Sequence, residues 1–138
     1  MVHCEVSAIA LCNSQGKILL QDRRSISKFG EEWGFFGGGV EQGETPEQAV
    51  RREAIEELEF KPKELIFLGK FSSSISQEDS VTVHLFFAPF PGFSSLNQHE
   101  GDGMKLFHID EARHLKTMQS DSALLDCVQS FLKTYKKG

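Results

Sequence analysis

The chain has 138 residues, of which 39% are hydrophobic and 25% are charged, as expected for one soluble globular domain. Its formal net charge of −5 argues against binding to a nucleic-acid duplex, which needs a positively charged surface. Three cysteines without C-x-x-C spacing and five histidines without an H-x-x-x-H pair predict neither a disulfide framework nor a structural zinc site.

No stretch approaches the roughly 20 apolar residues of a membrane-spanning helix. The apolar run at 6–12 is also too short for a signal peptide, so we expect a cytoplasmic protein that contacts no membrane. A basic tail of Lys133, Lys136 and Lys137 is expected to end a helix, where positive charge suits the helix dipole. If the protein binds phosphates, the positive charge must be local, and a divalent cation would supply it.

The first part of the chain predicts a β-hairpin followed by a loop. Apolar and polar residues alternate at 6–12, and a turn signal at 13–16 leads to a second strand at 17–21. Residues 25–34 are polar and contain glycine, so a loop is expected there. The run Gly37–Gly39 is expected to be too flexible for regular structure unless a specific reason holds it.

The clearest helix signals follow this glycine run. We expect Thr45 to cap the helix, Pro46 to occupy its first position and Gln48 to complete a capping box. The helix should extend to about Leu58, and Pro62 prevents it from continuing further.

The second half of the chain predicts strands at 65–73, 81–88 and 104–109, with a loop at 89–103, and then a short helix at 110–115. A last helix opens at Ser120 or Asp121 and places four side chains on one face: Leu124, Val128, Phe131 and Tyr135. This order of elements predicts an α/β layered domain with a mixed sheet, spanning residues 1–138 as a single domain.

Three carboxylates, Glu53, Glu56 and Glu57, lie in the second half of the predicted first helix. Their spacing puts them on one side of it, with Cβ atoms about 5–6 Å apart, so their charges repel. The helix dipole also disfavours anions near a C-terminus. A divalent cation would relieve both penalties, and oxygen ligands suit Mg²⁺ or Mn²⁺. The alternative is a solvated acidic face paired with Arg51 and Arg52.

Residues 38–60 resemble the motif of the Nudix hydrolase family, G-x5-E-x7-R-E-U-x-E-E-x-G-U, where U is a bulky aliphatic residue. Six of its fixed positions are present in register: Gly38, Glu44, Arg52, Glu53, Glu56 and Glu57. The chain departs from the motif at Ala54, an aliphatic position, and at Glu59, which replaces glycine. A left-handed backbone at Glu59 would cost around 1 kcal/mol, but this change affects the helix exit and should leave metal binding intact.

The resemblance implies a Nudix-type α/β/α sandwich with a mixed central sheet and a catalytic loop-helix-loop. It implies Mg²⁺-dependent hydrolysis of a diphosphate bond in a nucleoside diphosphate-linked substrate, with Mn²⁺ as an alternative metal. It assigns metal ligation to four residues: Gly37 through its carbonyl, Glu53, Glu56 and Glu57. It assigns to Arg52 and Glu44 an ion pair that orients this cluster.

The attacking water must also lose a proton to a base. Glu53 or Glu57 is one choice, but many family members use a glutamate from a later loop. Glu100 is the candidate, as base and as a further metal ligand, because nearby glycines predict a mobile loop with an exposed backbone. Glu78 and Asp79 in the preceding turn are alternatives, as is a Glu100 that simply faces solvent.

Four residues are candidates for substrate binding: Arg23, Trp33, Gly38 and Gly39. Trp33 lies in the polar loop before the glycines and is the preferred aromatic for stacking on a base, ahead of Phe29, Phe35 and Phe90, since phenylalanine at these spacings is typical of a core.

The substrate class is predicted from what region 73–78 lacks. It has neither the proline nor the tyrosine that often accompanies the ADP-ribose and dinucleoside polyphosphate branches, so a (deoxy)nucleoside triphosphate is expected, as for a MutT-like enzyme. A nucleotide-sugar or dinucleotide pyrophosphatase, a catalytically silent nucleotide-binding Nudix module and an acidic interaction domain are the alternatives. A homodimer is compatible with the resemblance.

Overall fold

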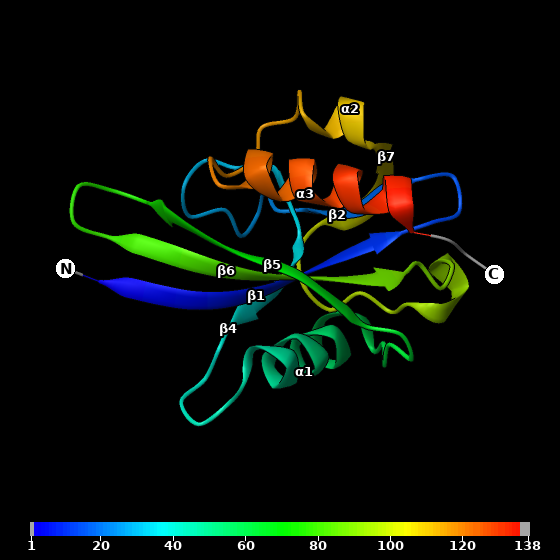
Figure 1. Cartoon of the computed structure of the whole chain (residues 1–138), viewed down its shortest axis with the longest axis horizontal. Coiled ribbons are helices and arrows are strands. Elements are labelled where there is room, and N and C mark those ends of the chain that lie inside the picture. The colour runs from blue at the N-terminus through cyan, green and yellow to red at the C-terminus, as the bar shows by residue number, and fades with distance from the viewer. Residues whose placement is uncertain (1, 136–138) are drawn as a thin grey trace.

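The computed structural model describes residues 2–135, so Lys136 and Lys137 of the basic tail lie outside the described residues. A central sheet is covered by α1 (Pro46–Leu58) on one face and by α3 (Asp121–Thr134), with the short α2 (Ile109–Ala112), on the other (Figure 1). The predicted α/β/α sandwich is thereby confirmed. In the described part of the chain, no helix is long and apolar enough to cross a membrane.

Seven strands form the sheet: β1 (His3–Cys12), β2 (Lys17–Asp22), β3 (Trp33–Gly34), β4 (Phe36–Gly39), β5 (Ile66–Ser74), β6 (Ser80–Pro89) and β7 (Gly103–His108). The order is β3-β2-β1-β6-β5, while β4 also pairs with β1 and β7 also pairs with β2. β1 and β6 are parallel, and every other pair is antiparallel, which confirms the predicted mixed sheet. A 3-10 turn at Phe93–Ser95 interrupts the long loop before β7.

The predicted hairpin of β1 and β2 is present, but its strands diverge after the turn. Asn13 shapes the turn, since its side chain accepts hydrogen bonds from the backbone N–H groups of Gln15 and Lys17 at 3.0 and 2.9 Å. Cys12 and Ile18 then form the only register pair between the two strands. Beyond it, β2 pairs with β7 and β3, and the far part of β1 pairs with β4.

The core has two halves because β1 is buried on both faces. Ala8 and Ala10 point toward α3, whereas Ile9 and Leu11 point toward α1. The α3 side chains of the first half are Leu124, Leu125 and Val128, and the α1 side chains of the second are Val50 and Leu58. The predicted apolar face of α3 continues to its end, where the rings of Phe131 and Tyr135 each lie 4.8 Å from that of Phe87.

The capping box predicted for α1 is confirmed. Thr45 Oγ1 accepts a hydrogen bond from the Gln48 N–H at 3.1 Å, and the Thr45 N–H donates to Gln48 Oε1 at 2.8 Å. At the other end Glu59 has φ 54° and ψ 40°, and it is the only non-glycine residue with positive φ in the described chain. The helix therefore ends in the left-handed conformation that the family motif usually gives to glycine.

The prediction of irregular structure at Gly37–Gly39 is wrong, because these residues form most of β4. The strand pairs with β1 from Val6 opposite Gly39 to Ile9 opposite Phe36. A Cβ atom on Gly37 would lie 2.1 Å from the Ser7 carbonyl oxygen, so glycine permits a close approach between the two strands. The predicted loop at 25–34 likewise ends in the short strand β3.

Candidate active site

Glu57 is the innermost carboxylate of α1, with only 5% of its surface exposed. Its Oε1 accepts a hydrogen bond from the Gly37 N–H at 3.1 Å, which joins α1 to β4. Burial is the largest of the effects that raise the pKa of Glu57 to about 9, and the neighbouring carboxylates of Glu53 and Glu100 contribute to the same rise. Glu53 and Glu57 of α1 and Glu100 of the long loop before β7 therefore lie together beside β4, the glycine strand.

Glu53 lies directly against this strand. A Cβ atom on Gly38 would be 2.5 Å from the carboxyl carbon of Glu53, so the absence of a side chain at Gly38 makes room for the acid. Glu53 Oε2 also accepts a hydrogen bond from Arg52 Nη1 at 2.8 Å. The carboxylate of Glu53 thus fills the space that a side chain at Gly38 would take.

Arg52 connects α1 to the loop that precedes it. Its Nε and Nη2 donate to the two oxygens of Glu44 at 2.8 and 3.0 Å, and Nη2 also donates to the Gly39 carbonyl at 2.9 Å. The hydrogen bonds from Arg52, with one from the Glu41 N–H, lower the pKa of Glu44 to about 2. The ion pair implied by the resemblance to the family is therefore present as a two-pronged contact that fixes the loop against the helix.

Glu56 takes a different position from its two neighbours. It is exposed, and its Oε1 lies 3.3 Å from Arg52 Nη1. Among residues 2–135, no three His, Cys, Asp or Glu side chains are already gathered as a metal-binding group. The donors still fit a hard divalent cation, because all of them are oxygen atoms. A cation would also offset the repulsion between the buried carboxylate of Glu57 and its acidic neighbours. Glu53, Glu57 and Glu100, with the Gly37 carbonyl, are the groups that would hold it.

Glu100 is exposed and lies in a segment that hydrogen bonds tie to β2. Gln21, which is fully buried, donates through Nε2 to the Glu100 carbonyl at 3.0 Å and to its Oε1 at 3.4 Å. The Asp102 N–H donates to the Asp22 carbonyl at 2.9 Å. Gly101 has φ 88°, and a Cβ atom there would lie 2.7 Å from the same carbonyl. The expected mobile loop is thus anchored, and the sequence signal for it was the polar Gln21 at the end of an apolar strand.

Arg23 and Trp33, two of the candidates for substrate binding, contact other side chains of the protein. Arg23 donates to the buried Glu31 at 3.0 Å and to Gln21 Oε1 at 2.6 Å. Trp33 packs edge-on against Phe107 in the core on the α3 side, with ring centroids 5.0 Å apart. These contacts occupy both side chains within the protein, whereas Gly38 and Gly39 remain beside the acids and Arg52.

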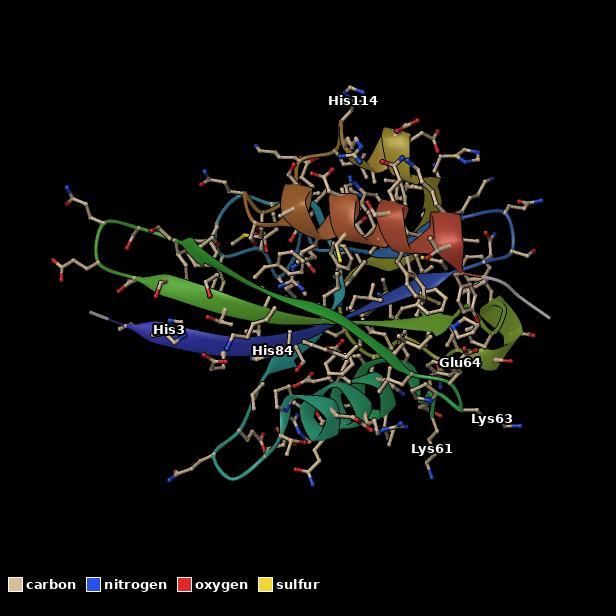
Figure 2. All side chains as sticks on the ribbon, in the orientation of Figure 1. His3, Lys61, Lys63, Glu64, His84 and His114 are labelled. Atoms are coloured by element: carbon tan, nitrogen blue, oxygen red, sulfur yellow. The ribbon has the colours of Figure 1, made fainter. Side chains whose placement is uncertain are left out.

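The alternative acids and a histidine cluster lie at the N-terminal end of β1 and in the turn before β6. Asp79 accepts a hydrogen bond from the Val2 N–H at 3.0 Å. Glu5 bonds His84 at 2.6 Å and His3 at 2.7 Å, and Figure 2 shows both histidines on the neighbouring strands β1 and β6. The contact of Glu5 with His84 joins the parallel strands β1 and β6 and gives the buried His84 a polar partner.

A cavity of about 290 Å³ opens where the ends of β5 and β6 meet the segment before α3. Its lining includes Phe29, Ser74, Ile75, Val81, Met118 and Gln119. Phe29 is 63% exposed, which is unusual for so large an apolar side chain. Of the aromatic residues considered for stacking on a base, the structure places Phe29 at a cavity.

Comparisons with known proteins give the family. The model of the NUDIX domain matches residues 1–126. RNA pyrophosphohydrolases of Aeromonas hydrophila and Psychromonas ingrahamii are each 41% identical over 62 residues, which are 44% of this chain and 33% and 32% of those proteins. The chain thus spans about one third of the length of the curated relatives it matches.

Solved structures match over nearly the whole chain. The E. coli ORF135 protein has a TM-score of 0.78 and 25% identity, with 100% of this chain and 96% of that one covered. The MutT protein of Methanosarcina mazei has a TM-score of 0.75 and 19% identity, with 98% and 96% covered, and shares the fold. The chain belongs to the NUDIX domain family.

Proposed function

We propose that this protein is a divalent-metal-dependent pyrophosphohydrolase that cleaves a diphosphate bond in a nucleoside triphosphate or deoxynucleoside triphosphate. The observation that carries the proposal is the meeting of Glu53, Glu57 and Glu100 beside the glycine strand. Stability alone would not favour a buried acid next to two others, since each adds to the cost of its charge. A site that binds Mg²⁺ and phosphate oxygens accounts for this arrangement.

The protein's own groups divide the work of such a site. A bound Mg²⁺ would neutralise phosphate charge and help to align the reacting groups. Glu53 and Glu57 would supply carboxylate oxygens to it, and Arg52 keeps Glu53 in place by its hydrogen bond. Gly38 leaves the space that the Glu53 carboxylate occupies, so this proposed metal ligand can lie directly against the backbone of β4.

Glu100 is the proposed base. It contacts Glu57 but is exposed, so that it reaches solvent and can accept a proton from an attacking water. Gln21 donates to both its backbone and its side chain and thereby limits its motion. The bond broken is a P–O bond of the diphosphate, and the water oxygen replaces the leaving phosphate.

The cavity beside Phe29 is proposed to receive the nucleoside. It combines an exposed aromatic ring with Ile75, Val81 and Met118, and the polar side chain of Gln119. Such a lining suits a flat base with hydrogen-bonding edges. A second candidate substrate is the 5′-triphosphate end of an RNA, because the relatives that share 41% identity over 62 residues are named RNA pyrophosphohydrolase.

The test is a phosphate-release assay in the presence of Mg²⁺. Inorganic pyrophosphatase converts any released pyrophosphate to phosphate, which is measured, and chromatography identifies the nucleotide products. The panel contains nucleoside triphosphates, nucleotide sugars, dinucleotides and a short 5′-triphosphorylated RNA. We expect turnover that EDTA abolishes and that Glu57→Gln and Glu100→Gln each lower by at least about a hundredfold. Glu47→Gln, on the exposed face of the same helix, is the matched control. Absence of turnover with nucleotide binding retained would instead assign a nucleotide-binding module.

A further inference from the structure

Glu59 stands where the family motif has glycine, and it keeps the glycine conformation. Its φ of 54° and ψ of 40° are unfavourable for a residue with a Cβ atom, whereas glycine adopts them freely. The backbone at this point is stabilised by the Glu59 N–H, which donates to the Ile55 carbonyl at 2.9 Å. Glycine would make that same backbone bond without strain. The bond therefore does not explain why a glutamate side chain is present at this position.

The Glu59 carboxylate reaches the segment that leads to Glu100. Its Oε2 accepts a hydrogen bond from Asn97 Nδ2 at 2.8 Å, and His99 Nε2 contacts the same oxygen. Both partners precede Glu100 in sequence by one to three residues. A side chain at the end of the metal-binding helix therefore holds the segment that carries the proposed base.

Backbone bonds bring the same two elements together. The Asn97 N–H donates to the Leu58 carbonyl at 3.0 Å, and the His99 N–H donates to the Glu57 carbonyl at 2.8 Å. These carbonyls belong to the last turn of α1, where helix carbonyls lack partners within the helix. The 97–99 segment thus caps the helix, and the Glu59 side chain adds two contacts to the same junction.

On its far side Glu100 is held by β2, through the bonds from Gln21 to its carbonyl and carboxylate. Gln98 Nε2 crosses the turn and donates to the Glu100 carbonyl at 2.6 Å and to the Gly103 carbonyl at 2.9 Å. Glu100 therefore lies between two anchors, one on α1 and one on β2. Loss of either anchor would widen the range of positions of its carboxylate relative to Glu57.

We propose that Glu59 is a positioning residue, whose carboxylate latches the 97–99 segment onto the end of α1 and so holds Glu100 beside Glu53 and Glu57. This inference rests on the proposed function, in which Glu100 is the base. It explains why an acid occupies a strained glycine position, since the latch needs a side chain that glycine does not have. An exposed surface acid without this role would gain nothing from the left-handed conformation.

The substitution Glu59→Gly removes the side chain that forms the latch and leaves the backbone conformation unchanged. Glycine relieves the strain and keeps the helix exit, so Tm should equal or exceed that of the wild type. Loss of the latch should lower kcat by about three- to tenfold with KM nearly unchanged, because exposed ion contacts are individually weak. Glu59→Gln keeps an acceptor oxygen at the same reach and should recover part of kcat. Glu47→Gln removes a charge from the same helix and should leave kcat unchanged.

Hydrogen–deuterium exchange supplies a readout that needs neither metal nor substrate. In Glu59→Gly, the amides of Asn97 and His99 should exchange at least about threefold faster than in the wild type, because local opening frees both. The amides of α1 before Ile55 should exchange at the wild-type rate. This pattern would place the effect at the junction and not in the helix as a whole.

The results of these experiments distinguish a failure of the Glu59 latch from a failure of the proposed function. Wild-type turnover that Glu100→Gln abolishes, combined with an unchanged kcat and unchanged exchange in Glu59→Gly, would overturn the latch alone. A large fall of Tm in Glu59→Gly would also overturn it, since Glu59 would then support the fold generally. Full activity of Glu100→Gln would remove the base from the mechanism and the positioning role with it.

Discussion

Asp121 is the first residue of α3, and only 7% of its surface is exposed. Its pKa is raised to about 7, chiefly by burial and to a smaller extent by the charge of Glu31, a second buried acid. A backbone hydrogen bond at Met118 and the charge of Arg23 oppose this rise. The charged form is therefore costly in the folded protein, although a helix N-terminus normally favours an anion. Replacing Asp121 with asparagine keeps the shape and removes the ionisation.

The sign and size of the effect follow from the two pKa values. The ordinary value is 3.8 and the folded value is about 7, so the folded protein holds this proton more tightly than the unfolded chain. The resulting stabilisation is fully present below pH 3.8 and is lost as the pH rises through 7. Each pKa unit corresponds to about 1.4 kcal/mol, so the whole loss is about 4 kcal/mol, and about 3 kcal/mol of it falls between pH 5 and 8.5.

Urea unfolding of wild type and Asp121→Asn at pH 5 and pH 8.5 measures this difference directly. The advantage of the variant in unfolding free energy should grow by about 3 kcal/mol between the two pH values, while other ionisable groups cancel in the comparison. Asp126→Asn, the same change on the exposed side of α3, should alter stability by less than about 1 kcal/mol at both. An advantage that stays constant or shrinks with rising pH would refute the burial argument.

Alanine substitutions at the three glycines of β4 should have unequal effects. Gly37→Ala should lower the unfolding free energy by about 3 kcal/mol, because its Cβ atom would collide with the backbone of β1. Gly39→Ala should be neutral, because no other atom lies within 4 Å of the added Cβ atom. Gly38→Ala should unfold nearly like wild type but lower kcat/KM by about a hundredfold, because its Cβ displaces the carboxylate of Glu53, a proposed metal ligand. Arg52→Lys cannot make the two-pronged contact and should lower kcat by about ten- to a hundredfold in the release assay. Phe29→Ala should raise KM for a nucleotide with little change in kcat, and an unchanged KM would separate the cavity from the substrate.

Elements with strong local signals were predictable from the sequence. Thr45, Pro46 and Gln48 define the start of α1 through contacts within one turn, so neighbours along the chain contain the needed information. The spacing of Glu53 and Glu57 likewise follows from helix geometry alone. The ion pair of Arg52 with Glu44 was also anticipated, although by resemblance to the family and not by spacing.

Features that depend on distant parts of the chain were not predictable. Gly37 belongs to a strand because β4 pairs with β1, and the Ser7 carbonyl of β1, thirty residues earlier, leaves no room for a side chain there. The contact of Gln21 with Glu100 joins residues 79 positions apart. Trp33 lies in the loop predicted at 25–34 and is a candidate for stacking on a base, but its ring packs against Phe107. Arg23, the other side-chain candidate for substrate binding, pairs with Glu31. Pattern alone cannot reveal such partners.

Three of the local rules that this chain breaks are broken in one part of the structure. Glu57 is a buried acid at the unfavourable end of a helix, Glu59 is a left-handed residue that is not glycine, and Gly37 is part of a strand. Each is unfavourable for stability by itself, and all three adjoin Glu100 or the carboxylates beside it. Such local conflicts are expected at functional sites, where stability is given up for geometry. Asp121 is a fourth conflict, and its N–H donates to the carbonyl of Met118, which lines the cavity. Asp121 therefore lies next to the cavity proposed to bind the nucleoside, and a local conflict at that position agrees with the proposal.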